Sequence, residues 1–398
     1  MDATLRLGTP SDLEGIWDVF RLGFGAKDAD RDRWTSEIDM TRVLLAEDEK
    51  GQIVAASHIR PFKQWFGGRA VPMGGYSPVA VLPEHRGRGW GRAVTTGQYP
   101  DLRDRGEVIA GLFPASVALY RSVGFELAGS YVHRRIPASH LANLQVHRPA
   151  IVRRGSQADV AAVHRCYDRL ASRLNGPVTR TAEWWGRRLP PDLADTVLFV
   201  IDHPTEPGEL QGYGSYRHGK ARPPFDYSVV VAEVRGADGD VLKSLWRVIG
   251  SSGSQAPDVE VIGAADDPLF LLMDAADPTA VRSEIRWMCR LIDAPGAVAA
   301  RGWNPTVRGR VDLFIADEHA PWNAGRWQLA VEDGVGRLTR GGDGTLELEI
   351  GGLSSWWSGY VSARTLATTG HLRTADPVAL ATFDGIGAAG PPTLVDFF

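Results

Sequence analysis

The order of apolar and polar positions over the first 148 residues predicts alternating strands and helices. Short apolar runs at residues 5–7, 43–46 and 53–59 have the length of strands, and a polar turn at 48–51 joins the last two into a hairpin. Ser11 and Glu14 have the spacing of a helix capping box, and apolar residues at helical spacing follow from 13 to 20. Buried strands are expected at 79–82 and 108–113, with a helix between them. This order is typical of a mixed α/β domain.

The same order begins again after residue 148. A shift of 147 positions places residues 5–9 on 152–156, Asp12 on Asp159 and Phe20 on Tyr167. An apolar hairpin strand recurs at 197–199, and residues 229–231 take the place of 79–81. We therefore expect a second copy of one fold over residues 149–287.

From residue 288 the pattern changes to short strands separated by glycine turns. The runs at 311–315, 327–331, 335–338 and 346–350 predict a sheet, and the segments 353–360 and 377–383 have helical spacing. We expect a third, α+β domain over residues 288–398. The chain ends on Leu394-Val395-Asp396-Phe397-Phe398, a largely apolar segment that we expect to pack inside the protein.

Composition limits the possible functions. The 398 residues are 43% hydrophobic and 23% charged, which is typical of a globular protein of two or three domains. The formal net charge of −4 provides no basic field for nucleic acid or an anionic membrane. Two cysteines cannot by themselves build a disulfide framework or a thiolate zinc site. With neither a signal-peptide pattern nor a bilayer-spanning apolar run, we expect a cytoplasmic protein without metal, nucleic-acid partner or membrane contact.

The richest candidate chemistry follows the strand at 79–82. Residues 83–92 read Pro-Glu-His-Arg-Gly-Arg-Gly-Trp-Gly-Arg, a turn rich in arginine and glycine that opens a helix. Glycine lets the backbone approach a ligand closely, amides at a helix start favour an anion, and arginine binds phosphate through two N–H groups. The segment predicts a phosphate-binding loop. An ordinary glycine-rich turn between strand and helix is the alternative.

Two motifs carry a family resemblance. Residues 86–91, Arg-Gly-Arg-Gly-Trp-Gly, resemble the R-x-x-G-x-G pyrophosphate loop of GCN5-related N-acetyltransferases, and residues 120–125, Tyr-Arg-Ser-Val-Gly-Phe, resemble the Y-x-x-x-G-F segment of the same fold. The length, the repeat and the terminal phenylalanine resemble the Eis-like (enhanced intracellular survival) branch. The resemblance implies two acetyltransferase-type domains in tandem, catalytic at 1–148 and degenerate at 149–287, followed by a sterol-carrier-like domain at 288–398.

The resemblance also implies roles for single residues. In the family, the loop holds the pyrophosphate of acetyl-CoA and the preceding strand pairs with the pantetheine amides. The family's tyrosine corresponds to Tyr120, as general acid for the departing thiolate, and its chain-end carboxylate to that of Phe398, as general base for the attacking amine. The cofactor-binding residues implied are Val79, Ala80, Val81, Arg86, Gly87, Arg88, Gly89, Trp90, Gly91, Arg92, Ala115 and Ser116.

Both proposed catalytic groups have a chemical rationale and a structural alternative. A phenol with a pKa of about 10 remains protonated at neutral pH and suits a thiol leaving group. A carboxylate with a pKa of about 3.5 is a weak base, so apolar surroundings or a relaying water would have to assist it. The alternatives are a core aromatic for Tyr120 and, for Phe398, a hydrophobic tail docked for stability.

The residues that would bind the acceptor amine are less clear from the sequence. Asp28, Asp30 and Trp34 follow the first helix, where the family's substrate cavity receives side chains, and could hold a cationic amine. A solvated acidic loop is the alternative. Phe397 stands where some relatives carry an acidic residue, which favours a small or apolar amine over a polycationic aminoglycoside.

The second copy lacks the loop chemistry. Its residues 235–240 read Arg-Gly-Ala-Asp-Gly-Asp, in which two carboxylates would repel a pyrophosphate. We expect this copy to act as a scaffold, and the resemblance implies a homohexamer.

The resulting prediction is metal-free acetyl transfer from acetyl-CoA to a primary amine by direct attack in a ternary complex. The rival hypothesis is a non-catalytic protein that senses acyl-CoA with its first domain and holds a lipid or a partner with its last.

Overall fold

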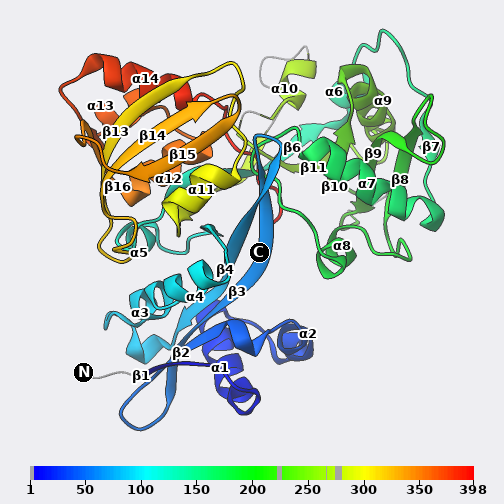
Figure 1. The fold of residues 1–398 in the computed structure, drawn as a ribbon. Helices are drawn as coiled ribbons and strands as arrows, with labels where there is room; N and C mark the ends of the chain where they lie inside the picture. The colour runs from blue at the N-terminus through cyan, green and yellow to red at the C-terminus, as the bar shows by residue number, and fades with distance from the viewer. Residues whose placement is uncertain (1–3, 222–225, 266, 274–279) are drawn as a thin grey trace. The chain divides into compact units, whose positions relative to one another are not determined.

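The computed structural model describes residues 4–221, 226–265, 267–273 and 280–398 (Figure 1). They form two compact units. The first unit contains the described residues up to Ala128, together with Arg286–Pro391 and Phe397–Phe398. The second unit contains the described residues of Gly129–Ile285 together with Pro392–Asp396. Each unit is therefore assembled from segments that are distant in sequence.

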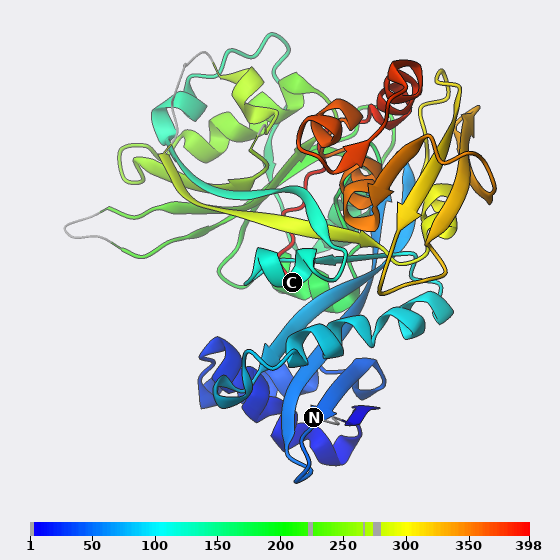
Figure 2. The same ribbon diagram turned by 90° about the vertical axis from the view of Figure 1, so that its left-hand side faces the viewer.

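A long antiparallel hairpin is the centre of the larger sheet in the first unit. The strand order is β1-β2-β3-β4-β5-β12, and β4 with β5 is the parallel pair of this series. The hairpin strands β3 and β4 are the long blue strands of Figure 2. They turn at Gly67 and Gly68, whose φ angles of +58° and +80° favour glycine. The sequence pattern predicted the second of these strands only from residue 79. The bounds are β1 (Thr4–Leu7), β2 (Val43–Glu47), β3 (Ile53–Phe66), β4 (Arg69–Val81), β5 (Ile109–Leu112) and β12 (Ala280–Leu291).

Helices cover both faces of this sheet. Figure 1 shows α1 and α2 on one side of β2–β4 and α3 and α4 on the other. The apolar stripe of α1 is buried, as its spacing predicts. The predicted helix start was wrong: Thr9 and Asp12 form the capping box, in place of Ser11 and Glu14, because a 3-10 turn precedes α1. The bounds are η1 (Pro10–Asp12), α1 (Leu13–Phe24), η2 (Asp28–Asp30), α2 (Arg31–Ser36), η3 (Met40–Arg42), η4 (Pro83–His85), α3 (Trp90–Thr96), α4 (Tyr99–Asp104) and α5 (Val117–Arg121).

The rest of the first unit is a smaller α+β fold. Its strand order is β15-β14-β13-β16-β17, with β13 and β16 parallel. All residues of α12 are buried, and its three serine hydroxyls, of Ser354, Ser355 and Ser358, donate to backbone carbonyls. The bounds are α11 (Ala294–Ala300), β13 (Gly309–Ala316), β14 (Gly325–Glu332), β15 (Val335–Arg340), β16 (Leu346–Glu349), α12 (Ile350–Ser358), α13 (Ala363–Thr368), β17 (Leu372–Arg373) and α14 (Pro377–Gly387).

The second unit repeats the topology of the N-terminal region. Its strand order is β6-β11-β10-β9-β8-β7. β10 pairs antiparallel with β9 and parallel with β11, as β4 does with β3 and β5. The bounds are β6 (Glu126–Pro137), α6 (Ala138–Ala142), β7 (Arg153–Arg154), η5 (Gln157–Asp159), α7 (Val160–Ala171), α8 (Ala182–Arg188), β8 (Val197–Asp202), β9 (Leu210–His218), β10 (Val229–Gly236), α9 (Gly239–Gly250), β11 (Asp258–Gly263) and α10 (Leu269–Leu272).

One ion-pair motif identifies the repeat at the level of single residues. Arg6 in β1 donates to Asp12 at 2.7 Å and to Glu47 at the end of β2 at 3.0 Å. Arg153 in β7 donates in the same way, at 2.7 Å each, to Asp159 and to Asp202 at the end of β8. The structure thus confirms the shift of 147 positions that places Asp12 on Asp159.

A buried ionic cluster holds the last segment of the chain within the second unit. The Asp396 carboxylate accepts from Arg180 at 3.0 Å, from Arg188 at 2.8 Å and from the Trp184 indole at 3.2 Å. Arg180 also donates to Glu233 at 2.7 Å. Burial by itself would raise the pKa of Asp396, but the charges of Arg180 and Arg188 outweigh it and hold that pKa below its usual value.

We expect Asp396→Ala to lower the free energy of unfolding by about 3–5 kcal/mol at neutral pH, because Arg180 loses a buried partner. The lowered folded-state pKa means that the Asp396 contribution is complete above its unfolded-state pKa of about 3.9 and is lost as the pH falls through the folded-state value. Denaturant titrations at pH 7 and at lower pH measure both effects. Arg165→Ala, which removes an ion pair with Glu209 on the surface, is the control and should cost little. Equal costs for the two variants at pH 7 would contradict the assignment.

Candidate active site

The residues predicted to bind a cofactor meet in one cavity of about 810 Å³ in the first unit. Its walls come from the end of α1, the end of β4, the loop that follows and the start of α5. Gly23, Phe24, His85 and Leu119 also line it, although the motifs did not identify them; Arg88 does not line it. The predicted residues on the wall are Val79, Ala80, Val81, Arg86, Gly87, Gly89, Trp90, Gly91, Arg92, Ala115, Ser116 and Tyr120.

The cavity lies where β4 and β5 stop pairing. Their parallel ladder runs from Met73–Ile109 to Gly75–Gly111. β5 ends at Leu112, whereas β4 continues through Val81. Among the residues that the structure describes, no strand pairs with this last part of β4 on the β5 side. Alternate N–H and C=O groups of residues 79–81 therefore face the cavity without a ladder, and an extended ligand with amide groups could pair with them.

The loop after β4 depends on glycine for its backbone conformation. Gly87 and Gly89 have φ angles of +76° and +86°, which side chains rarely adopt, while no atom lies within 4 Å of a Cβ built at either position. Gly89 is also the N-cap of α3, which has no side-chain cap. The loop therefore leaves the first backbone amides of α3 available to a ligand.

Three arginines make this loop cationic. Arg86 donates to the Val81 carbonyl at 3.4 Å, and Arg92 donates to the Ser122 hydroxyl at 3.2 Å. Within the described ranges, no carboxylate forms an ion pair with Arg86, Arg88 or Arg92. Arginine without a carboxylate partner, beside open backbone amides, is suited to binding phosphate groups.

Tyr120 reaches the cavity from α5. Ser116 caps that helix by accepting from the Leu119 amide at 3.4 Å. The Tyr120 side chain is buried, and its ring lies edge-on to Phe125 with centroids 5.8 Å apart. Burial raises the pKa of the phenol to about 12. The hydroxyl therefore stays protonated from neutral to moderately alkaline pH.

An arginine that the motifs did not reveal holds this segment in place. Gly124 has a φ of +87°, and a Cβ there would lie 1.6 Å from the Nη1 atom of Arg290. Arg290, in β12, donates to the Val123 carbonyl at 2.9 Å and to Asp317 at 2.7 Å. Because Arg290 is 167 positions away from Val123, no local pattern could have identified the contact.

The chain end lies against the point where β4 and β5 still pair. The Phe398 ring contacts Phe62 and Phe113, with centroids 5.0 and 5.6 Å apart. A Cβ on Gly75 would lie 3.0 Å from this ring, and one on Gly111 would lie 3.8 Å from it. The two glycines, which form the last pair of the ladder, therefore leave room for the ring. Phe398 does not line the cavity itself.

The structure does not bring the predicted substrate residues to the cavity wall. Asp28 lies 3.9 Å from Arg21, and Asp30 lies 3.3 Å from Arg33, on the surface. Trp34 packs against Phe24, with ring centroids 6.4 Å apart, and Phe24 lines the cavity. Phe397 is half exposed and packs on the Phe113 ring at 4.5 Å.

The comparisons with known families match this organisation. The description "Acetyltransferase (GNAT) domain" applies to residues 4–128 and again to 176–291, and "Sterol carrier protein domain" applies to 294–395. They define an acyltransferase with two acetyltransferase domains followed by a sterol carrier protein domain, which confirms the predicted fold class. Within the described ranges, no helix has the length and apolar character needed to cross a bilayer.

Relatives that match the chain over its full length identify its family. It is 30% identical to a GCN5-related N-acetyltransferase from Kribbella flavida, with a TM-score of 0.84 over 100% of this chain and 98% of that one. A GCN5-related N-acetyltransferase from Anabaena variabilis is 25% identical, with a TM-score of 0.90 over 100% of both chains. N-acetyltransferase Eis from Mycobacterium tuberculosis strain H37Ra is 27% identical over 422 residues, covering 100% of both. The chain belongs to the GCN5-related N-acetyltransferase family, in its Eis-like branch.

We expect Gly75→Ala to displace the chain end. The added Cβ would lie 2.8 Å from Phe62 and 3.0 Å from Phe398, so one ring must move, and the free energy of unfolding should fall by about 1–3 kcal/mol. Release of Phe398 by a carboxypeptidase under native conditions should become faster. Gly186→Ala in α8, where a Cβ meets no atom within 4 Å, is the control. Equal release rates for the two variants would show that Gly75 does not seat the ring.

Proposed function

We propose that the protein transfers the acetyl group of acetyl-CoA to a primary amine by direct attack in a ternary complex. The observation that supports this most is the cavity of about 810 Å³, which combines an open strand edge, a cationic loop and a buried tyrosine. Coenzyme A has amide groups along its arm and phosphates at its end, so each part of this donor meets a complementary feature of the cavity.

In this proposal the donor is bound mainly by backbone and arginine groups. Val79, Ala80 and Val81 pair with the amides of the pantetheine arm, because their open edge needs hydrogen-bond partners. Arg86 and Arg92, with the amides from Gly87 to Gly91, bind the pyrophosphate. Arg88 adds positive charge to the loop, and Ala115 and Ser116 close the cavity beside the arm.

The chemical step needs one acid and one base. The amine nitrogen attacks the thioester carbonyl carbon, a C–N bond forms, and the C–S bond breaks. Tyr120 gives its phenolic proton to the departing thiolate, and the Phe398 carboxylate takes the proton from the nitrogen. A backbone N–H of residues 79–81 stabilises the oxyanion. Exchange with water restores both groups, and the products are an amide and a free thiol.

The acidity of Tyr120 is compatible with this role. Burial raises its pKa to about 12, which makes it a weaker acid than a free phenol. A thiolate that forms in the same cavity is destabilised by the same loss of water, so its pKa rises as well. The two groups therefore remain comparable in basicity, as efficient proton transfer requires.

The surroundings of the chain end favour an acceptor with an apolar body. Phe62, Phe113, Phe397 and Phe398 bring four aromatic rings together there. Asp28 and Asp30 pair with arginines on the surface and lie off the cavity wall, so we propose no direct contact between them and the amine. Trp34 supports Phe24 at the cavity.

We also propose functional domains at 1–148, 149–287 and 288–398, the last supplying the chain-end carboxylate, in a cytoplasmic homohexamer. The boundaries rest on the sequence pattern. The assembly rests on the resemblance to a hexameric family.

A thiol-release assay tests the donor and the acceptor together. Acetyl-CoA is incubated with a panel of primary amines, and the acetylated product is identified by mass spectrometry. Release of thiol that depends on the amine supports the proposal. Binding of acetyl-CoA without transfer to any amine would support the rival hypothesis of an acyl-CoA sensor.

We expect Tyr120→Phe to lower kcat by about 10²–10⁴, the range for loss of a general acid. The dissociation constant for acetyl-CoA should stay nearly unchanged, because the ring remains. A general acid with a pKa of about 12 is lost only above that pH, so the wild-type kcat should not decline between pH 7 and 10 through this group. Tyr360→Phe, outside the cavity wall, is the matched control. Full activity of the Tyr120 variant would remove the assignment.

Converting the Phe398 carboxylate to a carboxamide should also lower kcat by about 10²–10⁴, since an amide cannot accept the proton. Intein-mediated amidation makes this change while keeping the ring and its contacts. Adding residues after Phe398 should abolish transfer while leaving acetyl-CoA binding intact, whereas the same extension before Met1 should not. An amidated enzyme that turns over normally would rule out the chain end as the base.

A further inference from the structure

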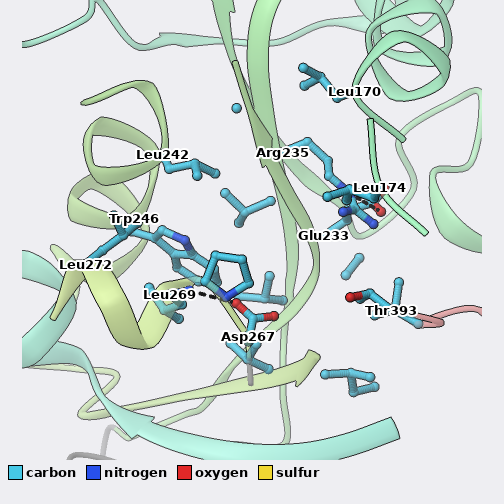
Figure 3. Close-up of a pocket in the computed structure, with 18 of the residues that line it drawn as sticks. Leu170, Leu174, Glu233, Arg235, Leu242, Trp246, Asp267, Leu269, Leu272 and Thr393 are labelled. Carbon is cyan, nitrogen blue, oxygen red and sulfur yellow. Dashed lines mark hydrogen bonds and ion pairs between the residues drawn. The ribbon is translucent and has the colours of Figure 1, made fainter. Parts of the chain in front are cut away.

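The second unit holds a cavity of about 220 Å³ at the place that corresponds to the first cavity (Figure 3). It lies where β10 and β11 stop pairing: their ladder joins Val229 to Val259 and Val230 to Glu260, while β10 continues to Gly236. Its walls include α7, β10, α9 and α10, which match α1, β4, α3 and α5 in chain order. β11 and the segment with Thr393 and Val395 complete the wall. The repeat has therefore kept the cavity and not only the fold.

Phosphate recognition has been lost from this second cavity. Asp238 caps α9 by accepting from the Val241 amide at 2.9 Å, whereas α3 has no side-chain cap. Asp240 accepts from the amides of His147 and Arg148, both at 3.2 Å. A phosphate at this loop would meet two carboxylates and a helix start that already has its acceptor, so a phosphate-bearing ligand is excluded.

The carboxylates on the wall already have partners. Glu233 accepts from Arg180 at 2.7 Å, from Tyr213 at 2.5 Å and from Arg235 at 3.0 Å. Asp267 accepts from the Leu269 amide at 2.9 Å. Arg173, the remaining charged residue of the wall, is exposed and can keep its charge in water. A complementary ligand is therefore uncharged, because no buried charge on the wall lacks a counter-charge.

Most of the remaining wall is apolar. Figure 3 shows Leu242 and Trp246 of α9 with Leu269 and Leu272 of α10 on one side of the central strands, and Leu170 and Leu174 on the other. In the described part of the chain, β10 beyond Val230 pairs on one side only, with β9. A β-bulge between Val231 and Glu233 interrupts the regular alternation. The N–H and C=O groups on the other side of β10 need partners, as those of β4 do. A ligand that offers both a donor and an acceptor in an extended arrangement satisfies them.

We propose that this cavity binds a small uncharged molecule in which a secondary amide joins two short apolar groups. The edge of β10 from Val231 to Arg235 pairs with the amide, and the leucines and Trp246 contact the apolar groups. The volume of about 220 Å³, against about 810 Å³ in the first unit, suits a small molecule and not coenzyme A. Such an amide comes either from an N-acyl amine or from a peptide-like compound. The site does not depend on the proposed acetyl transfer.

Two neighbouring leucines of α10 provide the test. Leu272 lines the cavity, whereas Leu271 is 90% exposed. Leu272→Trp should fill the cavity, and Leu271→Trp adds the same ring to the surface. Binding is followed by saturation-transfer NMR titration of the full chain with N-butylacetamide, an N-acyl amine, and with N-acetylvaline N-methylamide, a peptide-like diamide. Coenzyme A at high concentration is present to occupy the first cavity.

We expect at least one amide to bind wild type and Leu271→Trp equally, and to bind Leu272→Trp about tenfold more weakly or worse. Butyl acetate, which lacks the N–H donor, should bind wild type about fivefold more weakly than N-butylacetamide. The amide with the higher affinity identifies the source of the ligand. Equal binding by the two tryptophan variants, equal binding of the ester and the amide, or no binding of either amide to wild type would overturn the proposal.

Two further measurements keep the test decisive. Unfolding temperatures show whether Leu272→Trp is folded; if it is not, Ala232→Leu fills the cavity from β10 instead. The comparison between positions 271 and 272 stands whether or not coenzyme A binds the first unit. The binding test for the second cavity therefore gives the same result whether or not the protein proves to transfer acetyl groups.

Discussion

A strand that extends beyond its neighbour leaves backbone N–H and C=O groups that need hydrogen-bond partners, and both cavities of this protein depend on that condition. In the first unit β4 continues past its last pair with β5, at Gly75 and Gly111. In the second unit β10 continues past its last pair with β11, at Val230 and Glu260. The loops, helix ends and side chains around each gap decide what can fill it.

The two copies share this backbone arrangement but differ in the charged groups that surround the open strand edge. The first cavity is bordered by left-handed glycines, an uncapped α3 and arginines without carboxylate partners, so its loop is cationic. In the second, Asp238 caps α9 and the wall carboxylates are paired, so the cavity suits a small neutral molecule. Duplication thus preserved the geometry while the change of a few side chains at the loop changed the kind of ligand that fits.

Much of this was predictable from the sequence because the signals are local. The succession of strands and helices in each half, the repeat, the loop at 86–92 and Tyr120 follow from periodicity and from short motifs. Most residues of the predicted cofactor set do line one cavity. The sequence could not decide where the first helix begins, because the capping box of Ser11 and Glu14 overlaps that of Thr9 and Asp12. Arg6, in β1, binds Asp12 and so favours the box of Thr9 and Asp12.

The sequence by itself therefore determined the fold class and the duplication, and it identified the loop at 86–92 and Tyr120 as candidate site residues. Only the tertiary structure decided how these parts are held. Arg290 reaches Val123 from 167 positions away, and Arg180 reaches Asp396 from 216 positions away. It also decided that Phe398 lies over Gly75 and Gly111 and that a second cavity exists beside β10. Burial and contacts between distant residues create these features, and neither leaves a trace in the spacing of neighbouring residues.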